Sequence, residues 1–280
     1  MPIAKAADGT PLHYEVHDYT DPWRKAPTMI LQHGFARSGR FWFAAVPYLA
    51  RFFRVVCPDT RGMGGSVPLQ QPLERLTPAN CVDDFLRIAD HLEVDSFHFV
   101  GESIAGGMGL MLAGQHPARV RSLSAIAPAV YANDWLRQSY AVGFPTWEEA
   151  VRTLGVEGWV RKSNALARFP ADAPEGFLEW YVKEVGRNDV ESVAAMTRAA
   201  GAVDARPHLA AITAPVLVLY PDGGKIVTEE MAQLLLAQVR DIRVVRIPSP
   251  YQMLNLLAPA DCAHAILNFA ATREGFLPRE

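Results

Sequence analysis

Six short apolar runs, rich in β-branched residues, limit most strongly what this chain can fold into. In chain order they read TMILQH, FRVVCPD, FHFVG, VRSLSAIAP, PVLVLY and IRVVRIP, and each is short enough to be a buried strand. Patterns typical of helices lie between them, such as residues 77–92 after an N-cap at Thr77 and residues 228–239 after one at Thr228. Strands that alternate with helices form parallel sheets through right-handed crossovers. The sequence therefore predicts an α/β fold with a mostly parallel sheet.

Two regions depart from this alternation. Residues 3–17 predict two short strands around an Asp-Gly turn, which would form an antiparallel edge of the sheet. Residues 130–205 carry helical signals, among them the capping box from Thr146 to Glu149, and no convincing strand. We interpret residues 1–280 as a single domain in which residues 130–205 form a helical lid inserted over one edge of the sheet.

The helical insertion is rich in aromatic side chains. Most of them are expected to pack the insertion on the body of the protein, because aromatic rings dominate core burial. A minority are expected to line a pocket, and we assign Trp135, Trp147 and Trp159 to it.

Charge, cysteine content and hydrophobicity limit the kinds of molecule that the protein is expected to bind. A net charge of -3, with no cluster of Lys and Arg, argues against nucleic acid. Three widely spaced cysteines suggest neither a disulfide framework nor a metal site, and no dinucleotide fingerprint is present. The beginning of the chain lacks a signal-peptide pattern, and no apolar stretch reaches the roughly 18 residues of a membrane span. We expect a cytoplasmic protein with a small-molecule substrate or ligand, no membrane partner, no metal and no organic cofactor. No oligomeric state is predicted.

Residues 97–109 place Ser103 between a predicted strand and a predicted helix. Small residues at Gly101, Ala105 and Gly106 suit a sharp strand-to-helix turn, in the pattern G-x-S-x-G with its last glycine replaced by alanine. Such a turn would hold the hydroxyl at the positive end of the helix dipole. The alternative is a serine that only caps a helix. Because side chains alternate along a strand, Glu102 is expected to face away from Ser103.

Two more motifs precede this turn: His33-Gly34-Phe35, and Asp59 to Ser66 with the sequence DTRGMGGS. Together with Gly101 to Gly106 they resemble the α/β-hydrolase superfamily, in the branch of small esterases, enol-lactonases and C–C bond hydrolases, over nearly the whole chain. The resemblance implies an eight-stranded, mostly parallel sheet with helices on both faces and a helical lid. It makes Ser103 the nucleophile and the backbone N–H groups of Phe35 and Ile104 an oxyanion hole. His33 and Gly34 would lie at the pocket.

The resemblance breaks at the other two members of a Ser-His-Asp triad. The stretch LYPDGGKIVTEE puts Gly224 at the usual position of the acid, and IPSPYQ puts Gln252 at the usual position of the histidine. Asp222 is a weak alternative acid, since an aspartate before two glycines is typical of a turn. An amide can hydrogen-bond a serine but cannot take its proton near neutral pH. None of the eight histidines lies in residues 130–205 or in this last loop.

Three functions therefore stay open. The leading hypothesis is a hydrolase-related enzyme that acts on a small ester, lactone or related carbonyl compound at Ser103 with an incomplete triad. The second is non-hydrolytic chemistry in the same pocket, by a lyase, decarboxylase or cofactor-free oxygenase, with Ser103 and Gln252 as hydrogen-bond anchors. The third is a catalytically inactive, ligand-binding pseudoenzyme.

Overall fold

The six apolar runs and the two strands predicted in residues 3–17 form one eight-stranded sheet in the computed structural model, which describes residues 3–66 and 73–278. The strand order is β1-β2-β4-β3-β5-β6-β7-β8. The pairs β1–β2 and β2–β4 are antiparallel, and the other pairs are parallel, so the predicted mostly parallel sheet is confirmed. The strands are β1 Ile3–Lys5, β2 Pro11–His17, β3 Thr28–Gln32, β4 Arg54–Pro58, β5 Phe97–Glu102, β6 Val120–Ile126, β7 Val216–Pro221 and β8 Ile242–Ile247.

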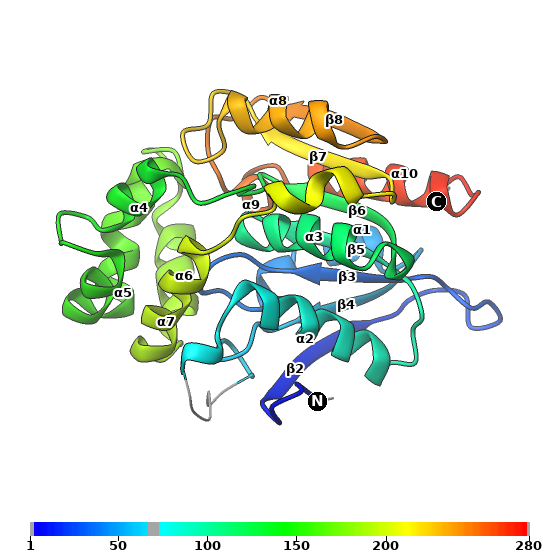
Figure 1. Cartoon of the computed structure of the whole chain (residues 1–280), viewed down its shortest axis with the longest axis horizontal. Helices are drawn as coiled ribbons and strands as arrows, with labels where there is room; N and C mark the ends of the chain where they lie inside the picture. The colour runs from blue at the N-terminus through cyan, green and yellow to red at the C-terminus, as the bar shows by residue number, and fades with distance from the viewer. Residues whose placement is uncertain (1–2, 67–72, 279–280) are drawn as a thin grey trace.

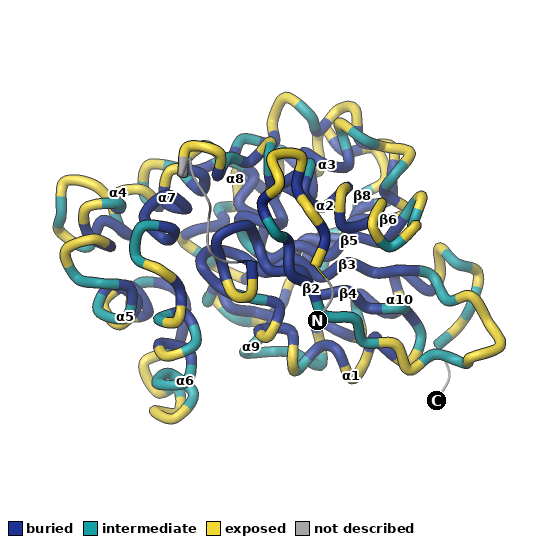
Figure 2. The backbone as a smooth tube through the Cα atoms, turned by 90° about the horizontal axis from the view of Figure 1, so that it is seen from below, coloured by how far each residue is buried: buried dark blue, intermediate teal, exposed yellow. Residues whose placement is uncertain are grey.

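Helices cover both faces of the sheet (Figure 2). Figure 2 shows α2 and α3 on one face and α1 and α10 on the other, with the buried strands between them. The helices outside the insertion are α1 Val46–Leu49, α2 Pro78–His91, α3 Ile104–Gln115, α8 Glu229–Gln238, α9 Leu254–Leu257 and α10 Pro259–Arg273. Short 3-10 turns lie at η1 Gly39–Trp42, η2 Leu73–Arg75, η3 Pro117–Arg119 and η4 Arg206–Ala211.

The two predicted N-caps behave differently. Thr77 caps α2, because its hydroxyl accepts a hydrogen bond from the backbone N–H of Asn80 at 3.2 Å. Thr228 occupies the N-cap position of α8, but its hydroxyl is buried without a hydrogen-bond partner among the described residues. Its carbonyl oxygen instead accepts a hydrogen bond from the Tyr220 phenol.

Between β6 and β7 the chain forms the helices α4 Asp134–Tyr140, α5 Trp147–Ala167, α6 Glu175–Gly186 and α7 Val190–Gly201. They gather at one end of the sheet, at the left of Figure 1. Thr146 caps α5 as its capping box predicts, and Gly155, with φ of +67°, interrupts the same helix. That this helical insertion acts as a lid stays a prediction. No helix in residues 3–66 or 73–278 is long and apolar enough to cross a bilayer.

A buried ion pair fastens the loop after β4 to α2. Arg61 donates from Nε to Oδ2 of Asp84 at 2.6 Å and from Nη2 to Oδ1 at 2.5 Å, and its Nη1 reaches Asp8 in the β1–β2 turn at 3.1 Å. Burial alone would lower the pKa of Arg61, but the hydrogen bonds and charge of Asp84 raise it above its ordinary value. The Arg61 guanidinium therefore stays charged, and the Asp84 carboxylate is what compensates this charge in the protein interior.

We expect Asp84→Ala to lower the free energy of unfolding by about 3 kcal/mol, because it leaves the buried Arg61 without its main partner. Urea unfolding followed by circular dichroism measures this. The matched control is Asp83→Ala on the same helix, which removes an exposed pair with Arg87 at 3.3 Å and should change stability by no more than about 0.5 kcal/mol. Equal losses in the two variants would contradict this role of Asp84.

Candidate active site

Ser103 sits on a strained turn between β5 and α3. Its φ of +56° and ψ of −118° are rare for a residue with a side chain, and such a conformation costs on the order of 1–3 kcal/mol. The turn is held by hydrogen bonds to the end of β6 and beyond: the Ser103 N–H donates to Ile126 at 2.9 Å, and the Ser103 carbonyl accepts from Ala129 at 3.0 Å. The neighbouring structure thus imposes the strain at Ser103.

Small residues let the strand and helix meet at this turn. A Cβ on Gly101 would collide with the carbonyl oxygen of Ala105, and a Cβ on Gly106 would lie 2.9 Å from the Cβ of Pro128. Larger residues at either position would push α3 off the sheet. The alanine that replaces the last glycine of the pattern is buried and accommodated.

Ser103 lines a small cavity with a free volume of about 20 Å³, which is room for about one water molecule. Its walls come from the loop after β3, the β5–α3 turn, the helical insertion and the loop after β8. The lining residues are Phe35, Arg37, Glu102, Ser103, Ile104, Leu136, Tyr140, Trp147, Arg168, Tyr181, Ile226, Gln252 and Met253. A substrate larger than water must therefore displace some of these side chains.

Two backbone donors lie at the cavity beside Ser103. Phe35 and Ile104 both line it, and the backbone N–H of each has no hydrogen-bond partner within the part of the chain that the structure describes. Unpaired N–H groups in a buried place are rare. They are available to an oxygen that develops negative charge, as an oxyanion hole requires.

Glu102 lines the same cavity, contrary to the expectation that it faces away. The strained φ of Ser103 breaks the alternation of side chains that a regular strand would continue. Glu102 is fully buried and forms an ion pair with Arg37, whose Nη1 also lies 3.3 Å from the sulfur of Met253. This pair neutralises the carboxylate that is nearest to Ser103 in the sequence.

Gln252 reaches the cavity from the loop after β8, but its amide is already engaged. Its Nε2 donates to the carbonyl of Ala127 at 2.8 Å, and its backbone N–H donates to Ala167 at the end of α5 at 2.9 Å. The amide has no basic nitrogen. Among the described residues, no histidine lines the cavity with Ser103.

The residues at the acid position lie outside the cavity lining. Gly224 is partly buried, and only Ile226, two residues later, reaches the cavity. Asp222 is exposed, sits in a turn with Gly223, and lies 3.9 Å from the guanidinium of Arg246. It is directed to the surface and not to Ser103.

Four other predicted pocket residues support the walls without lining the cavity. His33 donates from Nδ1 to the carbonyl oxygen of Gly34 at 2.7 Å, and its Nε2 accepts from the backbone N–H of Thr60 at 3.0 Å. Burial lowers the pKa of His33 to about 4, so the ring is neutral at physiological pH. Trp159 is fully buried against Phe35, with ring centroids 5.4 Å apart. Gly34 and Trp135 are also absent from the lining, whereas Trp147 is part of it.

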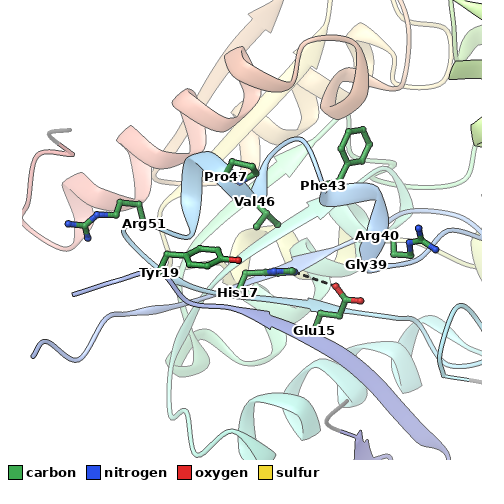
Figure 3. A pocket seen from close by; sticks show the side chains of 9 residues that line it. All are labelled: Glu15, His17, Tyr19, Gly39, Arg40, Phe43, Val46, Pro47 and Arg51. Atoms are coloured by element: carbon green, nitrogen blue, oxygen red, sulfur yellow. Dashed lines mark ion pairs between the residues drawn. The ribbon is translucent and has the colours of Figure 1, made fainter. Parts of the chain in front are cut away.

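A larger surface groove, of about 590 Å³, lies elsewhere, between β2 and the segment that contains η1 and α1 (Figure 3). Its charged side chains have partners of their own: His17 lies 3.4 Å from Glu15, and Arg51 lies 2.9 Å from Asp21. None of the residues around Ser103 lines it. The chemistry predicted from the sequence belongs to the small cavity and not to this groove.

The sequence model of the alpha/beta hydrolase fold family matches residues 27–259. This chain belongs to that family. The match covers both the β5–α3 turn and the helical insertion.

Relatives agree with this assignment. A protein named "Putative carbamate hydrolase RutD" from Serratia proteamaculans is 32% identical over 76% of this chain and 79% of its own length. Its namesake from Agrobacterium fabrum is 30% identical, and the alignment spans 65% of this chain and 65% of that protein. The crystal structure of the enol-lactonase from Burkholderia xenovorans LB400 superposes with a TM-score of 0.83 at 24% identity, covering 96% of this chain and 99% of that one, which shows the same fold.

Several residues that line the cavity of this α/β-hydrolase were not predicted from the sequence. Arg37 lies in the same loop as His33 and Phe35, so its place in the motif was a usable signal. Arg168 and Tyr181 reach the cavity only because the helices of the insertion pack over Ser103. No local pattern in the sequence marks them.

The depressed pKa of His33 predicts a pH dependence of stability. Because its pKa is about 4 in the folded protein and near 6.5 in the unfolded chain, stability is full above pH 6.5 and is lost as the pH falls toward 4. In His33→Gln we expect the slope of unfolding free energy against pH in this window to shrink by up to about 1.4 kcal/mol per pH unit. Urea unfolding at half-unit pH steps measures it. His98, whose pKa burial also lowers to about 4, keeps its own share of the slope. An unchanged slope would mean that His33 does not titrate as its burial requires.

Proposed function

We propose that this protein acts on the carbonyl group of a small ester, lactone or related compound at Ser103, as a hydrolase-related enzyme with an incomplete triad. One observation carries the proposal: a serine held on a strained turn shares a cavity with the unpaired N–H groups of Phe35 and Ile104. Strained residues persist where the surrounding structure enforces them, and they cluster at functional sites.

The chemistry follows from this arrangement. The Ser103 oxygen adds to the carbonyl carbon, the electron pair of the C=O bond moves to its oxygen, and the two N–H groups bind that oxyanion. The C=O bond then re-forms and expels the leaving group, so that the acyl group stays bound to Ser103. Water hydrolyses this acyl-enzyme, which releases the acid and frees Ser103. The proton of the Ser103 hydroxyl needs an acceptor, and Gln252 cannot supply one. Water or a basic group of the substrate must take it, so the reaction is expected to be slow.

The names of the relatives support a carbonyl substrate. A carbamate, which the RutD proteins are named for, and an enol-lactone, which the Burkholderia xenovorans enzyme is named for, both carry a carbonyl carbon open to attack. For this chain these names support only the broader class.

Non-hydrolytic chemistry or simple ligand binding is the second candidate function. It is favoured by the lining of the cavity, in which no histidine among the described residues can accept the proton of Ser103. In that case Ser103 and the oxyanion hole would bind and polarise a carbonyl ligand without forming an acyl-enzyme.

The first test of the proposal is covalent labelling by a fluorophosphonate. We expect intact mass to rise by one probe in the native protein over hours, and not in Ser103→Ala, because losing the base slows a serine hydrolase by several orders of magnitude but leaves the oxyanion hole. A native protein that is labelled no faster than Ser103→Ala, in an incubation several orders of magnitude longer than one that saturates an ordinary serine hydrolase, would reject hydrolysis and favour the second candidate.

The second test restores the missing groups. We expect the double variant Gln252→His/Gly224→Asp to hydrolyse p-nitrophenyl acetate at least tenfold faster than the native protein, since general base catalysis typically contributes 10²–10⁴-fold. Gly224 has no positive φ, but a Cβ there would lie 2.9 Å from Cγ of Pro221, so the proline ring must shift and the gain is expected at the low end. The control is the same pair of changes in Ser103→Ala, which should show no gain. A gain without Ser103, or none with it, would contradict the assigned roles.

A further inference from the structure

The cavity at Ser103 holds an unbalanced positive charge. Three charged side chains line it: Arg37, Arg168 and Glu102. Arg37 and Glu102 form an ion pair and cancel, which leaves one guanidinium in excess. The N-terminal end of α3 at Ser103 adds partial positive charge to the same space.

Arg168 is the unpaired cation. Only 6% of its surface is exposed, and within residues 3–66 and 73–278 no carboxylate lies within 4.0 Å of it. Its Nη1 donates to the hydroxyl of Ser163 at 2.8 Å and to the amide oxygen of Asn164 at 3.4 Å. Both partners are neutral. The donors on Nε and Nη2 remain for the Tyr140 phenol and for a ligand.

Aromatic rings hold the guanidinium in place. Its carbon lies 4.7 Å from the ring centroid of Tyr140 and 4.8 Å from that of Trp159, and the Trp159 indole N–H is fixed on the Tyr140 carbonyl at 2.8 Å. Cation–π contacts of this kind contribute on the order of 1–2 kcal/mol. They fix the direction of the side chain but do not neutralise its charge.

A buried charge without a counter-ion is costly, so its retention calls for a reason. Burial lowers the pKa of the neighbouring Arg37 to about 10, and the charge of Arg168 acts in the same direction. The indole N–H of Trp147, another lining residue, is also buried without a partner among the described residues. Each feature is relieved by an anion with hydrogen-bond acceptors.

We propose that the ligand of this cavity is a small carbonyl compound that carries a carboxylate, and that Arg168 binds this carboxylate. The inference rests on the proposed function, because it names the substrate class of the same site. One carboxylate balances the excess charge of +1, whereas a phosphate dianion would overcompensate it. A guanidinium also matches the planar carboxylate with two parallel hydrogen bonds.

Residues that flank Arg168 in the sequence line a surface groove. A groove of about 620 Å³ is lined by Asn164 and Phe169, which flank Arg168 closely in the sequence, and by Tyr251, the neighbour of Gln252. The ring of Phe169 packs on Tyr181, a lining residue of the cavity, with centroids 4.9 Å apart. Movement of this ring pair would join the groove to the cavity and admit the ligand beside Arg168.

The test compares acids with their uncharged amides at equilibrium. The probes are acetate, levulinate and benzoate against acetamide, levulinamide and benzamide, with inorganic phosphate as a further anion, and binding is measured by isothermal titration and by tryptophan fluorescence. We expect at least one acid to bind ten times more tightly than its amide. Arg168→Gln should abolish this preference, and Arg168→Lys should keep part of it. The matched control is Arg152→Gln on α5, the helix that Arg168 follows. The exposed side chain of Arg152 pairs with Glu191 at 2.9 Å, and its loss should leave the preference unchanged.

Each outcome decides the proposal. No preference for any acid, or a preference that survives Arg168→Gln, overturns it, and tighter binding of phosphate than of every carboxylate overturns the assigned class. Ser103→Ala should keep the preference, because binding precedes chemistry. If Ser103→Ala keeps the preference for the acid and the native protein takes up no fluorophosphonate, then the hydrolytic function fails while this inference stands.

A second measurement needs no ligand. If Arg168 serves a ligand and not the fold, Arg168→Met should unfold at the same temperature as the native protein or higher, because replacing an uncompensated buried charge by an apolar side chain of similar length is neutral or stabilising. A fall in the unfolding midpoint of more than about 5 °C would assign Arg168 a structural role and contradict the proposal.

Discussion

The strained turn at Ser103 is the constraint on which the rest of the site depends. The residue can hold φ of +56° only because the turn is hydrogen-bonded to Ile126 and Ala129, and because Gly101 and Gly106 let α3 approach β5. The same distortion reverses the side-chain alternation, so that Glu102 and Ser103 share one cavity. The positions of Ser103, of the Ile104 N–H group and of Glu102 therefore follow from one backbone geometry.

The two arginines that line the cavity differ in how their charges are compensated. Glu102 pairs with Arg37 close to the turn, which occupies the one carboxylate that lines the cavity among the described residues. Arg168 arrives from the helical insertion and remains unneutralised. A site that repels cations and lacks a base is suited to hold an anion more readily than to deprotonate a serine. On the proposed function, the site is therefore better equipped to bind an anionic ligand than to accelerate a reaction of that ligand.

Most of the fold and part of the candidate site could be predicted from the sequence. The predictions that were wrong or missing have physical reasons. The strands were predictable because each is a short apolar run, and Ser103 because small residues around a strand-to-helix turn form a local pattern. The direction of Glu102 was wrong because alternation holds only for regular φ and ψ. The place of Arg168 depends on how α5 packs over the sheet, and the bond from Gln252 to Ala127 spans 125 residues. Neither relation leaves a trace in the neighbouring sequence.

On the proposed function, Gln252 stands where the family resemblance leads us to expect a histidine, and it gives the last loop a different role. Gln252 ties that loop to Ala127 at the end of the sheet through its side chain, and to Ala167 of the insertion through its backbone. A catalytic histidine must use one ring nitrogen for the serine and the other for the acid, which leaves none for Ala127. Gln252 offers no proton acceptor but connects the walls of the cavity, in agreement with a free volume of only about 20 Å³. On the proposed function, a reaction at Ser103 therefore has two requirements. The contacts of Gln252 with Ala127 and Ala167 must open, and a proton acceptor must come from the ligand or from water.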